Sequence, residues 1–273
     1  MVPAVGPACR CNLADSEWIV LGASETGTSH EATKAPCLDS HLALEVSTPT
    51  GPVLVAACSD GAGSAARSEE GSKVACAAVH QAARAAYEDP AGPPSVVTKE
   101  HVQAWFARAR DEVERRASEL NVPSRDLACT LLVAVVSREA AVFGQVGDGC
   151  IVVREGDQYT PVLWPDNGEY ANTTTFVTDT RAAEALMFTS RAKVDEIALM
   201  TDGLQRLALR MADRSVQQSF FAPFFKELRA TDQPDELYAP LLQWLRSPTV
   251  NARTDDDKTL VLAIRRANAV EAH

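Results

Sequence analysis

The sequence lacks an apolar run long enough to cross a membrane. Its longest strongly apolar stretch, residues 127–136, includes a cysteine and a threonine and has about half of the roughly 20 residues that a membrane-spanning helix needs. Residues 1–15 also lack the charged-then-apolar pattern of a secretory signal. The seven cysteines are odd in number and scattered through apparent core segments, so they form no evident disulfide framework. We therefore expect a reduced, cytoplasmic protein.

Basic residues are also scarce. The 26 Lys and Arg residues are outnumbered by 37 Asp and Glu residues, which gives a net charge of -11. No block of basic residues is long enough to follow a nucleic-acid backbone, so nucleic-acid binding is not expected. An acidic surface repels phosphorylated substrates as well, so phosphate chemistry on this chain needs bound cations that reverse the local field.

The chain length fits one large domain. The 273 residues, 46% of them hydrophobic, suffice for one sizeable core. No internal repeat or low-complexity segment divides them. We expect a flexible N-terminus at 1–15, a single domain at 16–266 and a C-terminal tail at 267–273.

Short segments with strand patterns surround two long helical patterns. Helices are predicted at 64–87 and 98–120, on either side of a Pro-rich break, and a further helical region spans 204–245. The predicted strands are 18–21, 42–46, 53–58, 127–137, 140–146, 150–154, 173–178, 197–200 and 259–264. The last of these is nearly all apolar and should lie inside a sheet. Two groups of strands with helices between and after them indicate a layered α+β domain.

Three apolar runs end in the same pair of residues. Asp60, Asp148 and Asp202 each follow such a run, and each is followed by glycine. Asp-Gly is a favoured two-residue hairpin turn, and the apolar residues directly after the second pair make Asp148 the best candidate for a plain hairpin. Helical patterns follow Asp60 and Asp202, so a tight turn does not explain those two carboxylates.

A fourth acidic group precedes the last predicted strand. Residues 255–257 are three consecutive aspartates, whose mutual repulsion costs stability unless cations or water neutralise it. A solvated loop is the alternative reading. Oxygen ligands gathered at strand ends suit hard ions such as Mg²⁺ or Mn²⁺, whereas zinc prefers His or Cys.

These motifs, in this order, resemble the metal-dependent serine/threonine protein phosphatases of type 2C (the PPM family). Residues 59–64 resemble the family's Asp-Gly-x-Gly motif, 147–149 its central Gly-Asp motif, and 201–203 its Thr/Ser-Asp-Gly motif. Residues 256–260 resemble its C-terminal Asp-Asp/Asn motif, and 129–130 its small-Thr pair. The resemblance runs through nearly the whole chain and implies a sandwich of two antiparallel β-sheets flanked by α-helices on both sides, a four-layer αββα fold.

The resemblance also assigns metal ligands. It implies that Asp60 bridges two Mn²⁺ or Mg²⁺ ions, that the Gly61 carbonyl helps to hold one, and that Asp202 and Asp256 hold the other. Asp148 would belong to a weaker third site. A water bridging the ions would then be the nucleophile, acidified by them, which makes Asp60, Asp202 and Asp256 the catalytic carboxylates.

The N-terminal motif departs from the family pattern. The family has an Arg followed four and five positions later by an acidic pair, and the corresponding residues here are Lys34, Leu38 and Asp39. Leu38 cannot bind an ion, so weaker metal affinity is expected. The region resembles a bacterial subgroup with Ser-His and Cys-Gln-Asp at these places. Lys34 and His30 are candidate ligands for the substrate phosphate, with ordinary loop residues as the alternative. Asp39 and Asp257 are expected to contact the metal ligands rather than the ions.

A second departure concerns the leaving group. Ala62 stands where many members have a His proposed to protonate it. His30, His41 or metal-bound water remain as alternatives. The segment 163–185 is a candidate substrate-facing flap.

Three functions are compatible with these residues. The resemblance implies metal-dependent hydrolysis of phosphoserine and phosphothreonine in proteins, with phosphoproteins and a cognate serine/threonine kinase as partners. The alternative is a weak or inactive phosphatase-like module that binds phosphoproteins or regulates a kinase pathway. A phosphohydrolase acting on small molecules is the third reading.

Overall fold

The computed structural model describes residues 16–89, 97–165, 174–231 and 233–266. The predicted flexible N-terminus and C-terminal tail lie outside these residues, so the predicted domain bounds stay a prediction. In the described part of the chain, no helix combines the length and the apolar character needed to cross a membrane.

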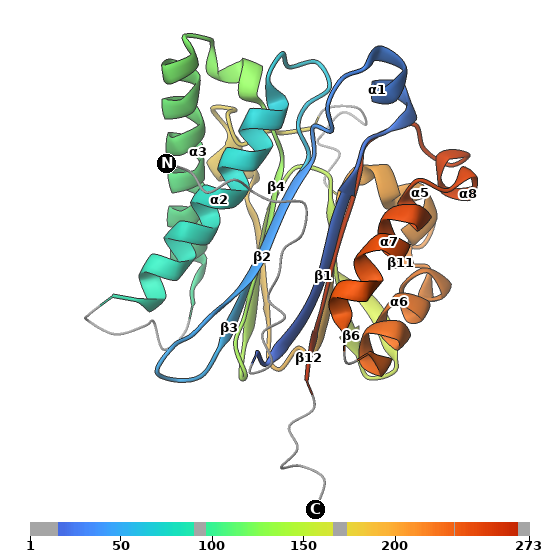
Figure 1. Cartoon of the computed structure of the whole chain (residues 1–273). Coiled ribbons are helices and arrows are strands. Elements are labelled where there is room, and N and C mark those ends of the chain that lie inside the picture. Colours follow the sequence, from blue (N-terminus) through green and yellow to red (C-terminus); the bar gives the residue numbers. More distant parts are fainter. Residues whose placement is uncertain (1–15, 90–96, 166–173, 232, 267–273) are drawn as a thin grey trace, which may run out of the picture.

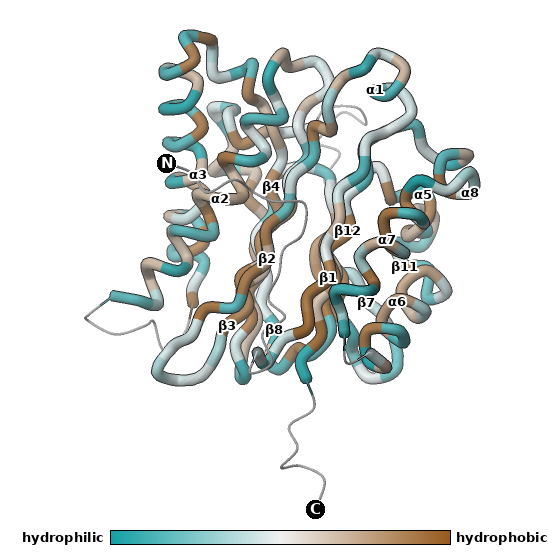
Figure 2. The backbone as a smooth tube through the Cα atoms, viewed as in Figure 1, coloured by the Kyte–Doolittle hydropathy of each residue, from teal (hydrophilic) through white to brown (hydrophobic). Residues whose placement is uncertain are grey.

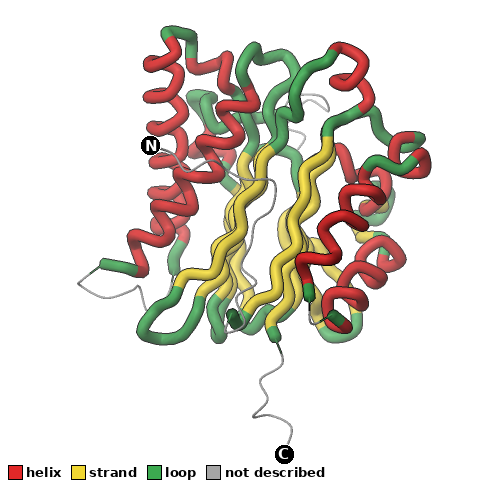
Figure 3. Tube along the Cα trace, viewed as in Figure 1, coloured by secondary structure: helices red, strands yellow, loops and turns green. Residues whose placement is uncertain are grey.

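Two five-stranded sheets form the centre of the molecule, and every neighbouring pair of strands is antiparallel. Sheet A has the order β1 (Trp18–Glu25), β12 (Lys258–Arg265), β9 (Glu196–Met200), β6 (Cys150–Glu155) and β7 (Gln158–Leu163). Sheet B has the order β2 (Ser40–Val46), β3 (Val53–Ser59), β4 (Leu131–Val136), β5 (Ala141–Val146) and β8 (Met187–Arg191). The two sheets stack face to face between helices (Figures 1 and 3).

Long helices cover both outer faces. Helices α2 (Ser68–Tyr87) and α3 (Lys99–Leu120) pack on sheet B, and α6 (Gln218–Ala230) and α7 (Tyr238–Leu245) pack on sheet A. The short helices, 3₁₀ turns and remaining strands are α1 (Thr28–Thr33), η1 (Ser124–Leu127), α4 (Ala182–Ala185), η2 (Asp202–Leu204), α5 (Gln205–Ala208), β10 (Leu209–Arg210), β11 (Ser215–Val216), η3 (Pro234–Leu237) and α8 (Pro248–Asn251). The predicted four-layer αββα sandwich is confirmed.

Alternation of side chains along each strand produces three apolar layers. In β3, Val53, Val55 and Ala57 face α2 and α3, whereas Leu54 and the other alternate residues face sheet A. The same alternation operates in β12, as expected for strands covered on both faces. Figure 2 shows the resulting hydrophobic colour along the strands of both sheets. Continuous apolar runs in the sequence therefore correspond to strands buried between two layers.

Three local predictions are wrong. Residues 174–178 form no strand; instead Val177 packs in the layer beneath α3, and its backbone N–H donates to the Cys129 carbonyl. The region 204–245 is interrupted by the β10–β11 hairpin and by loops. Asp148 does not lie in a hairpin, because β5 belongs to sheet B and β6 to sheet A. The segment 147–149 instead carries the chain from one sheet to the other.

Candidate metal centre

Asp60 is fixed where β3 ends. Its backbone N–H donates to Thr130 Oγ1 at 3.0 Å, and the Thr130 N–H donates to the Asp60 carbonyl at 2.8 Å. The Ser59 hydroxyl donates to the Thr130 carbonyl at 2.5 Å. These bonds hold the end of β3 against the start of β4. The small-Thr pair found in the sequence therefore positions the first predicted ligand.

Gly61 allows a close approach of three chain segments. It forms an isolated antiparallel bridge with Cys129. A Cβ at residue 61 would lie 2.7 Å from the Leu38 carbonyl oxygen and 2.9 Å from the Ser68 Cβ. Any side chain here would push the loop before β2 away from the end of β3, so the glycine is required by space.

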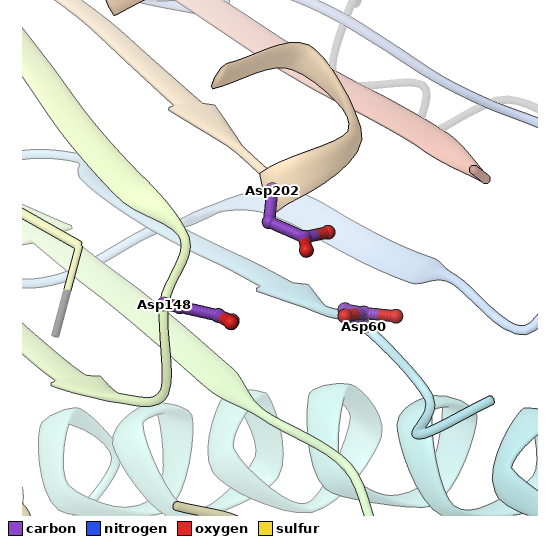
Figure 4. A group of neighbouring side chains, drawn as sticks. All are labelled: Asp60, Asp148 and Asp202. Carbon is purple, nitrogen blue, oxygen red and sulfur yellow. The ribbon is translucent and has the colours of Figure 1, made fainter. Parts of the chain in front are cut away.

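Three carboxylates converge at one edge of the sandwich. Asp60, Asp148 and Asp202 each place an oxygen so that all three lie within 4.8 Å of one another, and Figure 4 shows them pointing toward a common space. Asp60 follows a strand of sheet B, Asp202 follows a strand of sheet A, and Asp148 lies on the crossing between the sheets. The Thr174 hydroxyl donates to Asp148 Oδ2 at 2.6 Å.

Asp39 lies directly behind this cluster. Its Oδ2 accepts hydrogen bonds from the hydroxyls of Thr201 and Thr259, both at 2.8 Å. Its Oδ1 is buried and has no hydrogen-bond partner among the described residues. The Asp39 carboxylate also interacts with that of Asp60. A buried carboxylate oxygen beside three converging carboxylates lies in a field that a bound cation would stabilise.

The pKa values of these carboxyl groups reflect the same crowding. Burial, followed by the charges of Asp39 and Asp202, raises the pKa of Asp60 well above its ordinary value. Burial, followed by Asp148 and Asp256, raises the pKa of Asp202 to about 8. Burial also raises the pKa of Asp39 to about 7. The folded protein thus concentrates negative charge that a bound cation would stabilise.

The donor set fits a hard divalent cation. Asp60, Asp148 and Asp202 offer only oxygen, and neither His nor Cys joins them in the cluster that the described residues form. Oxygen ligands of this kind suit Mg²⁺ and Mn²⁺ rather than zinc.

The consecutive aspartates near the C-terminus separate into different environments. Asp256 is exposed and lies outside the group within 4.8 Å, although its charge raises the pKa of both Asp60 and Asp202. Asp257 is buried, and its two oxygens accept the backbone N–H groups of Gly27 and Leu38, each at 2.6 Å. Asp257 therefore ties two N-terminal loops to the start of β12, a role that its sequence position did not reveal.

The predicted phosphate ligands lie on or next to α1. His30 Nδ1 is 3.0 Å from Asp257 Oδ1, which places the imidazole at the acidic turn. Lys34 is exposed, has φ 59° at the end of α1, and forms no ion pair with another described residue. The Leu38 side chain is buried, and its carbonyl accepts a hydrogen bond from the Ser72 hydroxyl at 2.6 Å.

His41 lies away from the surface of the site. Its Nδ1 is 2.8 Å from Ser24 Oγ, and burial lowers its pKa to about 4. An enclosed, neutral imidazole is poorly suited to protonate the leaving group of a macromolecular substrate, so the structure removes His41 from that list.

Comparisons with known proteins identify the class of protein to which this fold and carboxylate cluster belong. A family model described as protein phosphatase 2C matches residues 26–246. Serine/threonine-protein phosphatase 3 of Escherichia coli (strain K12) is 40% identical over 252 residues, which cover 90% of this chain and 98% of that protein. The chain belongs to the protein phosphatase 2C family, and as such it is a protein phosphatase.

Solved structures share the fold at low sequence identity. A bacterial serine phosphatase is 16% identical with a TM-score of 0.59, and the match covers 91% of this chain and 98% of that one. The catalytic domain of serine threonine protein phosphatase PstP, in complex with 2 manganese ions, is 16% identical with a TM-score of 0.58, over 90% of this chain and 97% of that one.

Proposed function

We propose that this protein hydrolyses phosphoserine and phosphothreonine in proteins and depends on Mn²⁺ or Mg²⁺ for that reaction. The observation that carries the proposal is the convergence of the Asp60, Asp148 and Asp202 carboxylates within 4.8 Å. The serine/threonine-protein phosphatase that is 40% identical over most of the chain supports the substrate class. The manganese-bound relative with the same fold supports the choice of ion.

The ligands of two ions and of a weaker third site are assigned as the family resemblance implies. Asp60 and the Gly61 carbonyl would hold one ion, Asp60, Asp202 and Asp256 the other, and Asp148 a third. When bound, such ions supply a water of lowered pKa and offset the charge of the phosphoryl group.

The chain's own residues arrange the site around those ions. Thr130 fixes the backbone of Asp60 through two hydrogen bonds, which set the point from which the carboxylate extends. Asp257 holds the loops that carry Gly27 and Leu38 against the acidic turn. Such rigid placement lowers the reorganisation needed during the reaction.

Two roles concern the substrate itself: binding of its phosphate and protonation of the leaving group. We assign contact with the substrate phosphate to Lys34 and His30, and the positive charge of Lys34 would offset an otherwise acidic surface. Ala62 has no proton to give, and His41 is enclosed. His30, next to Asp257, is then the side chain left among the sequence candidates for protonating the leaving group.

The test is a comparison of phosphate release with Mn²⁺ and with EDTA. A phosphothreonine peptide should be hydrolysed only with the metal, and Asp60→Asn should abolish the reaction. Asp111→Asn removes an equal charge from the exposed face of α3 and should leave the rate unchanged. Binding of the phosphopeptide without turnover in millimolar Mn²⁺ would refute the proposal, and a preference for free phosphate esters would refute the substrate class.

Phosphorylated proteins are therefore the proposed partners, together with a cognate serine/threonine kinase that supplies them. The cytoplasm is the proposed compartment.

A further inference from the structure

A chain of hydrogen bonds leads from the sandwich interior to the metal centre. His41 Nδ1 lies 2.8 Å from Ser24 Oγ, and Ser24 Oγ lies 2.7 Å from Thr259 Oγ1. The Thr259 hydroxyl then donates to Asp39 Oδ2 at 2.8 Å, where the Thr201 hydroxyl donates as well. We call these five residues the His41 chain.

Two hydroxyl groups of this chain donate to the same carboxylate oxygen. Thr259 Oγ1 donates to Asp39 Oδ2, and Thr201 Oγ1, which accepts the backbone N–H of Thr259 at 3.0 Å, donates there as well. In the contacts of Ser24 with Thr259 and with His41, either group can donate, and the tautomer of the imidazole decides which does.

The chain connects the two sheets. Ser24 in β1 lies directly opposite Thr259 in β12, and both strands belong to sheet A, as does β9, which Thr201 follows. Asp39 and His41 lie immediately before and within β2, which is in sheet B. Figure 1 shows β1 and β2 facing each other across the sandwich.

Gly22 in β1 leaves space for the imidazole of His41. A Cβ at residue 22 would lie 2.7 Å from His41 Cδ2 and 2.8 Å from its Nε2. The ring also hydrogen-bonds the Gly22 backbone. Buried polar groups cost free energy compared with apolar side chains unless every donor is matched. Gly22 thus makes room between the sheets for an imidazole whose Nδ1 is hydrogen-bonded within the His41 chain.

The metal ligands depend on how the sheets are aligned at this edge. Asp60 follows a strand of sheet B, whereas Asp202 comes directly after Thr201 and a strand of sheet A. Asp39 interacts with Asp60 on one side and receives the Thr201 hydroxyl on the other. The Asp39 carboxylate thus bridges the two ligand-bearing segments, and the His41 chain fixes its orientation from behind.

We propose that His41 and Ser24 are positioning residues that set metal affinity by holding Asp39 between the segments that carry Asp60 and Asp202. The inference rests on the proposed metal-dependent phosphatase function. Neither residue touches the ions or the substrate. Their effect is transmitted through Thr259.

The test compares variants that remove or keep the hydrogen bonds. Ser24→Ala and His41→Leu each break the chain, whereas Ser24→Thr and His41→Asn keep a hydroxyl or an N–H donor. We expect the breaking variants to weaken Mn²⁺ binding by roughly tenfold, in line with outer-layer partners of metal ligands. The preserving variants should stay within about threefold of the parent. Mn²⁺ binding is measured by calorimetry and, independently, from the Mn²⁺ dependence of phosphopeptide hydrolysis.

Ser16→Ala is the matched control. The Ser16 hydroxyl is also buried and bonded, to the Trp18 carbonyl at 2.9 Å, but it lies at the opposite end of β1. It should lower the melting temperature without changing Mn²⁺ binding. The double variant Ser24→Ala/His41→Leu should bind Mn²⁺ no more weakly than the worse single variant, because both substitutions break one chain.

Equal Mn²⁺ binding in the parent, Ser24→Ala and His41→Leu would overturn the inference while leaving the proposed function intact, and so would additive losses in the double variant. Should His41→Leu fail to fold, Ser24→Ala and Thr259→Val against Thr259→Ser decide the question in the same way. A parent that binds Mn²⁺ in the calorimeter but hydrolyses no phosphopeptide would overturn the proposed function alone.

Discussion

Asp60, Asp148 and Asp202 each place a carboxylate oxygen within 4.8 Å of the other two. Two ionised carboxylates at that separation repel each other by about 3 kcal/mol at an effective dielectric constant of 20. The raised pKa of Asp60, caused by burial and then by the charges of Asp39 and Asp202, reflects the same repulsion. Replacing Asp60 by Asn removes the charge permanently, so we expect the metal-free protein to gain about 1–2 kcal/mol of stability.

The gain should be visible in thermal unfolding. For a domain of this size, 1 kcal/mol corresponds to about 2–4 °C in the melting temperature. With EDTA, Asp60→Asn should therefore melt about 2–8 °C above the parent. With Mn²⁺ the order should reverse, because bound ions should stabilise the parent, whereas the variant lacks the carboxylate proposed to bridge them.

The assay is a melting curve of each protein in EDTA and across a Mn²⁺ titration. Asp111→Asn, on the exposed face of α3, controls for the loss of one negative charge from an acidic chain. A lower melting temperature for Asp60→Asn in EDTA would refute the electrostatic reasoning. An undiminished Mn²⁺ response in Asp60→Asn would refute its assignment as the bridging ligand.

Two further outcomes follow from the same cluster. The free energy of unfolding of the metal-free protein should fall as pH rises from about 4 to about 8. In the folded protein the pKa of Asp202 is about 8 and that of Asp39 about 7, whereas the ordinary value is 3.8. The folded state therefore binds more protons than the unfolded state in that pH window, and raising the pH removes this stabilisation. Urea unfolding in EDTA checks this trend, which equal or greater stability at the alkaline end would contradict. Asp257→Ala leaves the buried N–H groups of Gly27 and Leu38 without an acceptor. It should lower the free energy of unfolding in urea by about 2–4 kcal/mol, more than Asp257→Asn does. A loss no larger than that of an exposed Asp→Asn substitution would show that Asp257 does not hold the two loops in place.

The sandwich was predictable because most of its strands are recognisable from short apolar runs in the local sequence. Runs such as 53–58 and 259–264 are apolar on both faces, and the structure buries both faces. Of the four edge strands, β7 and β8 were not predicted. In β8 every residue is only partly buried or exposed, so the sequence offers no apolar alternation to read. The predicted strand 173–178 rested on the β-propensity of threonine, which tertiary packing of Val177 overrides.

Sheet membership was the information that local sequence could not supply. An aspartate and a glycine between two apolar runs suggest a hairpin, yet the strand before Asp148 pairs with β4 and β8, and the strand after it pairs with β7 and β9. Two of those partners, β8 and β9, are distant in the chain. The consequence is that Asp148 joins Asp60 and Asp202 instead of closing a turn.

The neighbouring acids Asp256 and Asp257 show the same limit. The family resemblance assigned the first to the ions and the second to a supporting role, and both assignments stay predictions. What separates the two side chains in the structure is contact with Gly27 and Leu38, residues that no local pattern connects with the end of the chain.

The position of β12 between β1 and β9 has a consequence for biosynthesis. Asp60 is synthesised early, whereas Asp257 and β12, whose Thr259 donates to Asp39, follow roughly 200 residues later. At 5–20 residues per second this interval takes roughly 10–40 s. Until then sheet A lacks an interior strand and the acidic cluster lacks its backing. A nascent chain therefore lacks part of the proposed metal centre, and we expect phosphatase activity only after synthesis of this strand is complete.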